Sequence, residues 1–557
     1  MKINSFKIFL MTCILIGIGI RIACIPGYYP EHGAVLQAAM GRALFNQGAL
    51  LMEFGPIFED EHDLIHPSLS QHFPPVYPVL IGTFTAKSKN VLDDLRILSF
   101  RITLLTFLII LLLTRRMFGE IQSYFVTAGF LLHGALIDNA SKCLSENIQI
   151  LLIVLFLASV MMSKIKRGYW ILSGFLLGLA YLSKSTLPFW FTIGIVSFTV
   201  MYVSFKNGKI APWLISALAV FILTILPWGL RNYYIFGTFE TSEYISSSLY
   251  AIFSEPLLFR KGIFINLPVI CLMITPFLIF AKELRKVDIK DPFDFLCIFF
   301  AVGSFALSIL YSACFYSIEY SYLPVNSIRY VLIAIVPILM LIAKHSDFSS
   351  RLVIRKAFAL ISVLLISAVF VLIYAYTVTD KPLINEPDWV LSQKVAHSLS
   401  RLSAQDKKRS NTIDVVFDDS INKNDFYYYL FALESAGIKY INLVHAENYR
   451  PNNPRRASPT DGPAIIIYSG EYAPHFQTDH GYSKYTRCTL MYGNSDPDLF
   501  ERGLWIYRNI SKVDKSGHKI DNAKHSVRSL AVQKDFWLDL FIPPKSKKDR
   551  STQHVVN

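Results

Sequence analysis

The fold of this chain is decided by residues 28–96, a polar segment that separates its first apolar run from its second. The segment begins with YYPEHG at 28–33 and reaches SQHFPPVYP at 70–78, shortly before the second apolar run. A carboxylate directly after one apolar run, with an aromatic and proline-rich stretch before the next, suits an enzyme that works on a lipid-borne substrate. We therefore expect this segment to lie at the surface of a bilayer.

The composition indicates an integral membrane protein. Of 557 residues, 53% are hydrophobic and 17% are charged, and the mean hydropathy is +0.40. A soluble chain of this size needs far more polar surface. The apolar runs approach the ~20 residues that span a bilayer. We therefore expect a polytopic α-helical membrane protein with about eleven transmembrane helices. Their expected cores are Ile8–Cys24, Ile97–Leu113, Ile121–Ile137, Ile148–Met162, Tyr169–Leu182, Phe189–Phe205, Trp213–Leu230, Ile263–Phe280, Phe293–Tyr311, Tyr330–Ala343 and Ala357–Tyr376.

The distribution of lysine and arginine predicts the orientation. If the spans alternate, the loops richest in these residues fall on one side, which is the cytoplasm because Lys and Arg resist translocation. We expect a multi-pass protein of the cell (inner) membrane with a cytoplasmic N-terminus. The first outer loop, residues 27–95, and everything after residue 379 then lie outside. The basic loops are 2–7, 115–116, 164–167, 206–209, 282–290 and 344–356.

The net charge of +13 follows largely from this topology. The cations are dispersed over short loops, which argues against a nucleic-acid partner. They suit the anionic headgroups of a membrane surface instead.

The composition changes after residue 379 and divides the chain into two parts. Residues 1–379 form the membrane module, and residues 380–557 are polar and long enough to fold as a separate domain. Strand, helix and strand patterns alternate in this tail, which predicts a C-terminal soluble α/β domain. The expected strands are 413–417, 440–444 and 464–468, and the expected helix is 424–436.

Three carboxylates on the outer side are candidates for chemistry. Glu31 follows Pro30 at the start of a pattern that predicts a helix along the membrane surface, where it either complements the helix dipole or acts as a general base. Glu146 opens the fourth span, and it either sits in the interface or faces inward as a functional group. Asp138 is either a plain loop residue or a third acidic group near the site.

Several cations lie on the same outer side. Lys184 separates two spans where positive charge is least expected, and it either snorkels to the interface or binds an anion. Arg231 and Arg329 stand at span ends beside aromatic residues, as interface anchors also do. Together with His72 they are candidates for neutralising a phosphate. Acids and cations on one side suggest a site that moves a sugar off a lipid phosphate.

These motifs, taken in order, resemble the GT-C class of membrane glycosyltransferases. The nearest group is the protein O-mannosyltransferase-like family, which includes the lipid A aminoarabinose transferases. The resemblance covers roughly the first three-fifths of the chain and not the tail. The residues that carry it are Arg21, Pro30–His32, His72–Pro78, Ser145–Glu146, Trp170–Lys184, Pro227–Asn232, Phe236–Gly237 and Arg329–Tyr330.

The resemblance implies a polyprenyl-phosphate sugar donor and a lipid, glycan or protein acceptor. It implies inverting transfer with Glu31 as the base, Lys184 on the donor phosphate, and Arg231, Arg329 and His72 as further phosphate contacts. Glu146 matches a family acid that lies near the donor phosphate or a metal, so a divalent cation is a possible cofactor, with Asp138 as a second candidate ligand. The family has Asp followed by Glu in the first loop, where this chain has Glu31 followed by His32.

Two other functions stay open on the sequence. A flippase or transporter of lipid-linked sugars would place ionisable residues within its spans, where this sequence has few. A non-catalytic glycolipid-binding protein is compatible with the changed acid pair at Glu31 and His32. An oligosaccharyltransferase is disfavoured because its Trp-Trp-Asp signature is absent from the sequence.

Overall fold

The structure is a computed structural model, and it describes the chain in several stretches. The described residues are 3–24, 30–47, 51–52, 68–69, 74–88, 90–184, 194, 197, 211–236, 239, 273–317, 329–379, 412–417, 432, 439–445, 465–468, 482–491 and 501–509.

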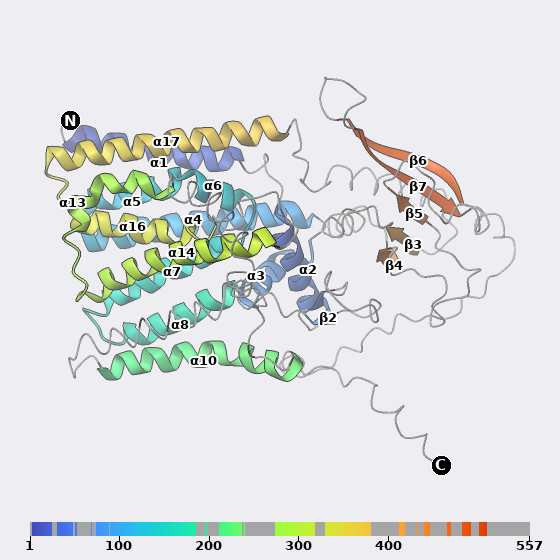
Figure 1. Ribbon diagram of the computed structural model, residues 1–557, viewed down its shortest axis with the longest axis horizontal. Coiled ribbons are helices and arrows are strands. Elements are labelled where there is room, and N and C mark those ends of the chain that lie inside the picture. The colour runs from blue at the N-terminus through green and yellow to red at the C-terminus, as the bar shows by residue number, and fades with distance from the viewer. Residues whose placement is uncertain are drawn as a thin grey trace, which may run out of the picture.

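A bundle of helices that run side by side forms most of the described chain (Figure 1). Apolar residues face both the interior and the outside of the bundle, as expected for helices in lipid. The helices are α1 (Ile3–Cys24), α4 (Val91–Phe118), α5 (Glu120–Leu132), α6 (Gly134–Ser141), α7 (Glu146–Met162), α8 (Tyr169–Ser183), α10 (Ala211–Phe236), α14 (Pro292–Ser317), α16 (Leu332–His345) and α17 (Arg351–Thr379), with the short η1 (Thr275–Phe280) and α13 (Ala281–Leu284).

Four of the described helices are long and apolar enough to cross a membrane, which supports a multi-pass membrane protein. They are Ile3–Cys24, Val91–Phe118, Pro212–Tyr234 and Arg351–Ile373. The expected spans at 189–205 and 263–280 fall largely outside the described residues. The total of about eleven spans therefore stays a prediction.

One expected span is interrupted. The sequence predicted a continuous core over Ile121–Ile137, but α5 ends at Leu132 and α6 begins at Gly134. The Arg21 side chain of α1 donates hydrogen bonds to the carbonyl oxygens of Phe130 (2.8 Å) and Leu131 (3.2 Å). A cation that satisfies these last-turn carbonyls stabilises the helix end.

The first loop contains two helices that pack closely together. They are α2 (His32–Gln47) and α3 (Val76–Thr85), and two short antiparallel strands, β1 (Leu51–Met52) and β2 (Ser68–Leu69), lie between them in sequence. Gly41 of α2 meets α3 so closely that a Cβ there would overlap the carbonyl of Pro78. The helix expected after Glu31 is present, and its apolar residues, such as Ala38 and Met40, are buried in the protein.

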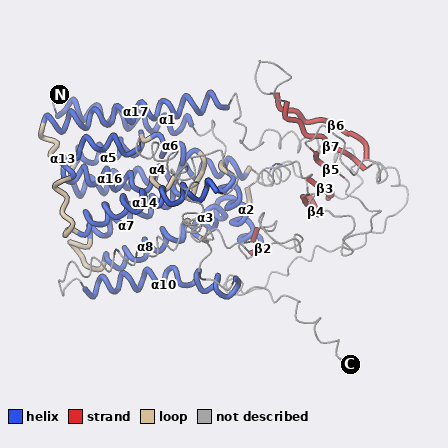
Figure 2. The backbone as a smooth tube through the Cα atoms, in the orientation of Figure 1, coloured by secondary structure: helices blue, strands red, loops and turns tan. Residues whose placement is uncertain are grey.

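Ion pairs tie together the end of the bundle where α1 begins, which we call the basic end (Lys7, Glu120, Lys164, Asp291, Asp294 and Lys344). Lys344 contacts Asp291 at 2.7 Å and the buried Asp294 at 2.6 Å. Burial raises the pKa of Asp291, but hydrogen bonds from Lys164 and Lys344 outweigh it and hold the pKa below its usual value. In Figure 2, connecting loops of this end are drawn in tan on the side marked N.

The C-terminal region contains a five-stranded sheet, which Figure 1 shows beyond the end of the bundle that carries α2. The strand order is β4-β3-β5-β7-β6, with β3 parallel to β4 and β5, and β7 antiparallel to β5 and β6. The strands expected at 413–417, 440–444 and 464–468 are present, whereas the helix expected at 424–436 lies outside the described residues apart from Ala432. A separate α/β domain at 380–557 therefore remains a prediction. The strands are β3 (Thr412–Phe417), β4 (Lys439–His445), β5 (Ile465–Tyr468), β6 (Tyr482–Met491) and β7 (Glu501–Asn509).

Candidate functional site

A buried carboxylate, Glu146, lies between two cations. It is the first residue of α7 and is 1% exposed. The Lys184 ammonium donates a hydrogen bond to its Oε1, and Nε of Arg329 lies 3.4 Å from the same oxygen. Two cations around one buried carboxylate offset the cost of removing its charge from water.

Arg329 also reaches Glu31, so four charged groups form a continuous row. Its Nη1 donates a hydrogen bond to Oε1 of Glu31 at 3.2 Å, and the ammonium of Lys184 lies 4.7 Å from the ring centroid of Tyr330. The order of charges is negative, positive, negative, positive along Glu31, Arg329, Glu146 and Lys184. We call these four residues the charge row.

Helix ends account for three members of the charge row. Glu146 lies in the first turn of α7, and Lys184 directly follows the last residue of α8. The Glu31 carbonyl accepts from the Val35 amide at 3.1 Å, which puts Glu31 at the start of α2. Acids are stabilised at helix N-termini and cations at C-termini, so each of these charges has the sign that the local dipole favours.

The turn between α6 and α7 connects the charge row to the first loop. The Glu31 amide donates a hydrogen bond to the carbonyl oxygen of Lys142 at 2.9 Å, and the Tyr77 hydroxyl donates to that of Cys143. Asp138, a candidate from the sequence, lies in α6 and pairs at 2.9 Å with Lys142, the residue that directly follows α6. The structure thus gives Asp138 a local partner at the start of this turn.

The remaining candidates lie apart from these contacts. Arg231 is buried on α10, where its guanidinium lies 4.5 Å from the ring centroid of Trp228 and donates to Oδ1 of Asn232 at 2.9 Å. His72 lies outside the described residues. The roles of both residues on a phosphate stay predictions.

The described residues do not fit a divalent metal by themselves. Nowhere in the described ranges do three His, Cys, Asp or Glu side chains gather as a metal would require. Glu31 and Glu146 each face a cation, and one oxygen of Glu146, Oε2, has no hydrogen-bond partner among the described groups. A metal here would need further ligands from elsewhere in the chain.

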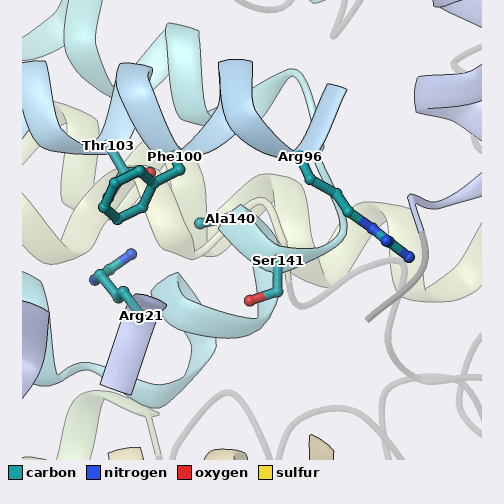
Figure 3. A pocket seen from close by; sticks show the side chains of 6 residues that line it. All are labelled: Arg21, Arg96, Phe100, Thr103, Ala140 and Ser141. Carbon is teal, nitrogen blue, oxygen red and sulfur yellow. The ribbon is translucent and has the colours of Figure 1, made fainter. Parts of the chain in front are cut away.

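A small cavity lies beside the site, between α1, α4 and α6 (Figure 3). Its volume of about 20 Å³ is enough for one water molecule and too small for a sugar. In the sequence, Arg21 was named only among the residues that carry the family resemblance, and the structure places it in the cavity wall. The lining residues are Arg21, Arg96, Phe100, Thr103, Ala140 and Ser141.

Known proteins match this chain in sequence over one segment and in structure over most of its length. Residues 72–228, which include Glu146 and Lys184, match the family described as dolichyl-phosphate-mannose-protein mannosyltransferase. No curated protein sequence matches the chain. The fold is similar to that of ArnT from Cupriavidus metallidurans bound to undecaprenyl phosphate, with a TM-score of 0.54 and 11% identity over 90% of this chain and 98% of that one.

Two further solved structures are similar. The apo state of the same ArnT gives a TM-score of 0.51 at 11% identity, covering 90% of this chain and 97% of that one. The oligosaccharyltransferase of Archaeoglobus fulgidus tethered with an acceptor peptide gives 0.46 at 13% identity, covering 78% and 63%.

The fold and the family match indicate the GT-C class of membrane glycosyltransferases. The match of residues 72–228 to the protein mannosyltransferase family and the similarity of fold to ArnT confirm the resemblance seen in the sequence.

Proposed function

We propose that this chain is an inverting glycosyltransferase that moves a sugar from a polyprenyl-phosphate donor to a lipid, glycan or protein acceptor. The observation that carries this proposal is the charge row, in which two carboxylates and two cations meet at helix ends. The row belongs to the outer side if the basic end is cytoplasmic. The similarity of fold to ArnT, solved with undecaprenyl phosphate, supports a lipid-linked donor.

In this proposal Lys184 and Arg329 hold the donor phosphate. Both are partly buried, at 12% and 21% side-chain exposure, so an anion there would be bound in a medium of low dielectric. Glu146 keeps the two cations in place while the phosphate is absent. Arg231 and His72 are the secondary phosphate contacts.

Glu31 acts as the general base. It is the most exposed carboxylate of the charge row, at 32%, so an acceptor hydroxyl can reach it. In the free protein Arg329 neutralises it, and the arriving phosphate draws Arg329 away. Glu31 then takes the proton of the acceptor hydroxyl. The acceptor oxygen attacks the anomeric carbon opposite the phosphate, the bond to the phosphate oxygen breaks, and polyprenyl phosphate leaves with both electrons.

The test is mass spectrometry of envelope glycolipids and glycoproteins from cells with and without the gene. Loss of a hexose or pentose modification in the deletion strain is expected, with recovery on expression of the wild-type chain. The Glu31→Gln variant should restore no modification, because an amide cannot accept the proton. The matched control is Glu120→Gln, which removes an exposed carboxylate paired with Lys7 at the basic end; it should restore the modification fully.

Full activity of the Glu31→Gln variant would refute the role of Glu31. A deletion strain that loses lipid translocation and keeps every sugar modification would instead favour a flippase. An unchanged glycolipid and glycoprotein profile, with glycolipid still bound by the purified chain, would favour a non-catalytic binding protein.

A further inference from the structure

The turn between α6 and α7 holds a strained backbone next to the charge row. Cys143 has a φ of 59°, in the left-handed region that residues other than glycine rarely adopt. Such a conformation is energetically unfavourable and persists only where its surroundings enforce it. Here the Cys143 amide donates to the carbonyl of Ala140 at 3.1 Å, and its carbonyl accepts from Tyr77.

This turn is connected to the backbone of both acidic residues of the charge row. Its Lys142 carbonyl accepts the hydrogen bond of the Glu31 amide at 2.9 Å, and three residues after Cys143 the chain reaches Glu146. The backbone of Glu31 and that of Glu146 are therefore fixed by one short segment, although they lie far apart in the sequence.

Tyr77 is the side chain that reaches this turn from the first loop. It lies on α3, two residues after Pro75, and is 1% exposed. A buried tyrosine hydroxyl needs a hydrogen-bond partner, and here the Cys143 carbonyl is that partner. The contact joins α3 to the turn that leads into α7, the helix that begins with Glu146. Because α2 packs closely on α3, the contact also links α2 to this turn.

We propose that Tyr77 is a positioning residue that sets the distance between Glu31 and Glu146 by holding the Lys142–Cys143 turn. The inference rests on the proposed function, because it makes Tyr77 act on the base through the Glu31 backbone. Misplacing a reacting group by about 1 Å costs on the order of a hundredfold in rate. Lys184 follows α8 and Arg329 precedes α16, so neither phosphate-binding cation of the proposal belongs to the turn, and we expect phosphate binding to persist when the turn relaxes.

The test compares Tyr77→Phe with Tyr124→Phe in the full-length protein. The control removes a hydroxyl of the same kind at the basic end, where Tyr124 donates to Glu120 at 3.1 Å. Three quantities are measured: hydrogen exchange of the peptide containing the Glu31 amide, binding of undecaprenyl phosphate, and sugar transfer in membranes with matched protein levels.

For Tyr77→Phe we expect faster exchange at the Glu31 amide, undecaprenyl phosphate binding at the wild-type level, and transfer lowered by about tenfold to a hundredfold. Tyr124→Phe should match the wild type in all three. Unchanged hydrogen exchange at the Glu31 amide would overturn the proposal. The proposal would also fail if undecaprenyl phosphate binding, sugar transfer and thermal stability all decreased together, because a purely structural role produces that result. If the wild type transfers no sugar, the proposed function fails, and the exchange measurement still decides whether Tyr77 holds the turn.

Discussion

At the scale of single residues, the contact between Lys184 and Glu146 decides whether the site holds together. Glu146 is almost fully buried, and a buried charge that loses its partner costs about 3–5 kcal/mol. Arg329 lies 3.4 Å from the same Glu146 oxygen, so it offsets part of that cost.

The substitution Lys184→Met tests this balance. We expect a fall in the unfolding temperature in detergent and loss of undecaprenyl phosphate binding, because one of the two cations proposed to bind the phosphate is gone. The double variant Lys184→Met with Glu146→Gln should recover the unfolding temperature, since no buried charge is left uncompensated, but should not recover binding. The control Lys7→Met breaks an exposed ion pair with Glu120, which is worth only about 0–1 kcal/mol. An unchanged unfolding temperature for Lys184→Met would show that Glu146 does not depend on Lys184.

Sequence patterns found the members of the charge row but not all their partners. Glu31, Glu146, Lys184 and Arg329 stood out as charged residues next to apolar runs on the expected outer side. The pairing of Glu31 with Arg329 could not be read from the sequence, because 298 residues separate them. Tyr77 was visible only as part of the proline-rich motif, since nothing local marks its bond to Cys143.

At the scale of elements, the approach of α2 to α3 fixes where Glu31 stands. Gly41 and Gly82 face each other, and a Cβ on either would collide with the backbone of the opposite helix. Small residues at such a crossing let two helices pack at their closest distance. Each of these glycines destabilises its helix by about 0.5–1 kcal/mol relative to alanine. The close packing of α2 on α3 offsets that cost.

Within α2, two glycines make a matched pair for testing this packing. Gly41→Ala should push α3 away, lower the unfolding temperature and reduce sugar transfer, because its Cβ would overlap the Pro78 carbonyl. Gly33→Ala has open space around its Cβ, and the higher helix propensity of alanine should leave stability unchanged or raise it by up to about 1 kcal/mol. Thermal unfolding in detergent measures both. Equal stability of the two variants would contradict the close packing of α2 on α3.

The hydropathy pattern predicted most of the described helices, but it did not predict the break between α5 and α6. The pattern over 121–137 is largely apolar, and hydropathy alone did not mark His133 and Gly134 as a break; Arg21 of α1 satisfies the carbonyls of the helix that ends at Leu132. A cap donated from another helix leaves no mark in the local sequence, whereas the cores of α4, α7 and α8 follow directly from their apolar runs.

At the scale of the whole molecule, charged side chains form a cluster of ion pairs at each end of the bundle. The basic end joins Lys164, Lys344, Asp291 and Asp294 in ion pairs that pin α14 and α16 together. The other end holds the charge row, with Arg329 three residues before α16 begins. One helix thus spans the distance between the two clusters, and the orientation of the protein decides on which side sugar transfer takes place.

The orientation is tested with single cysteines at exposed positions of opposite ends, in a chain whose seven native cysteines are replaced by serine. Lys166→Cys lies in the basic turn between α7 and α8, and Asn90→Cys lies at the start of α4 in the first outer loop. With a membrane-impermeant thiol reagent added to intact cells, we expect labelling of Asn90→Cys alone, because lysine-rich and arginine-rich loops stay in the cytoplasm. Permeabilised cells should label both variants, which controls for accessibility. Labelling of Lys166→Cys from outside would invert the topology, place the charge row in the cytoplasm and exclude extracytoplasmic transfer by this site.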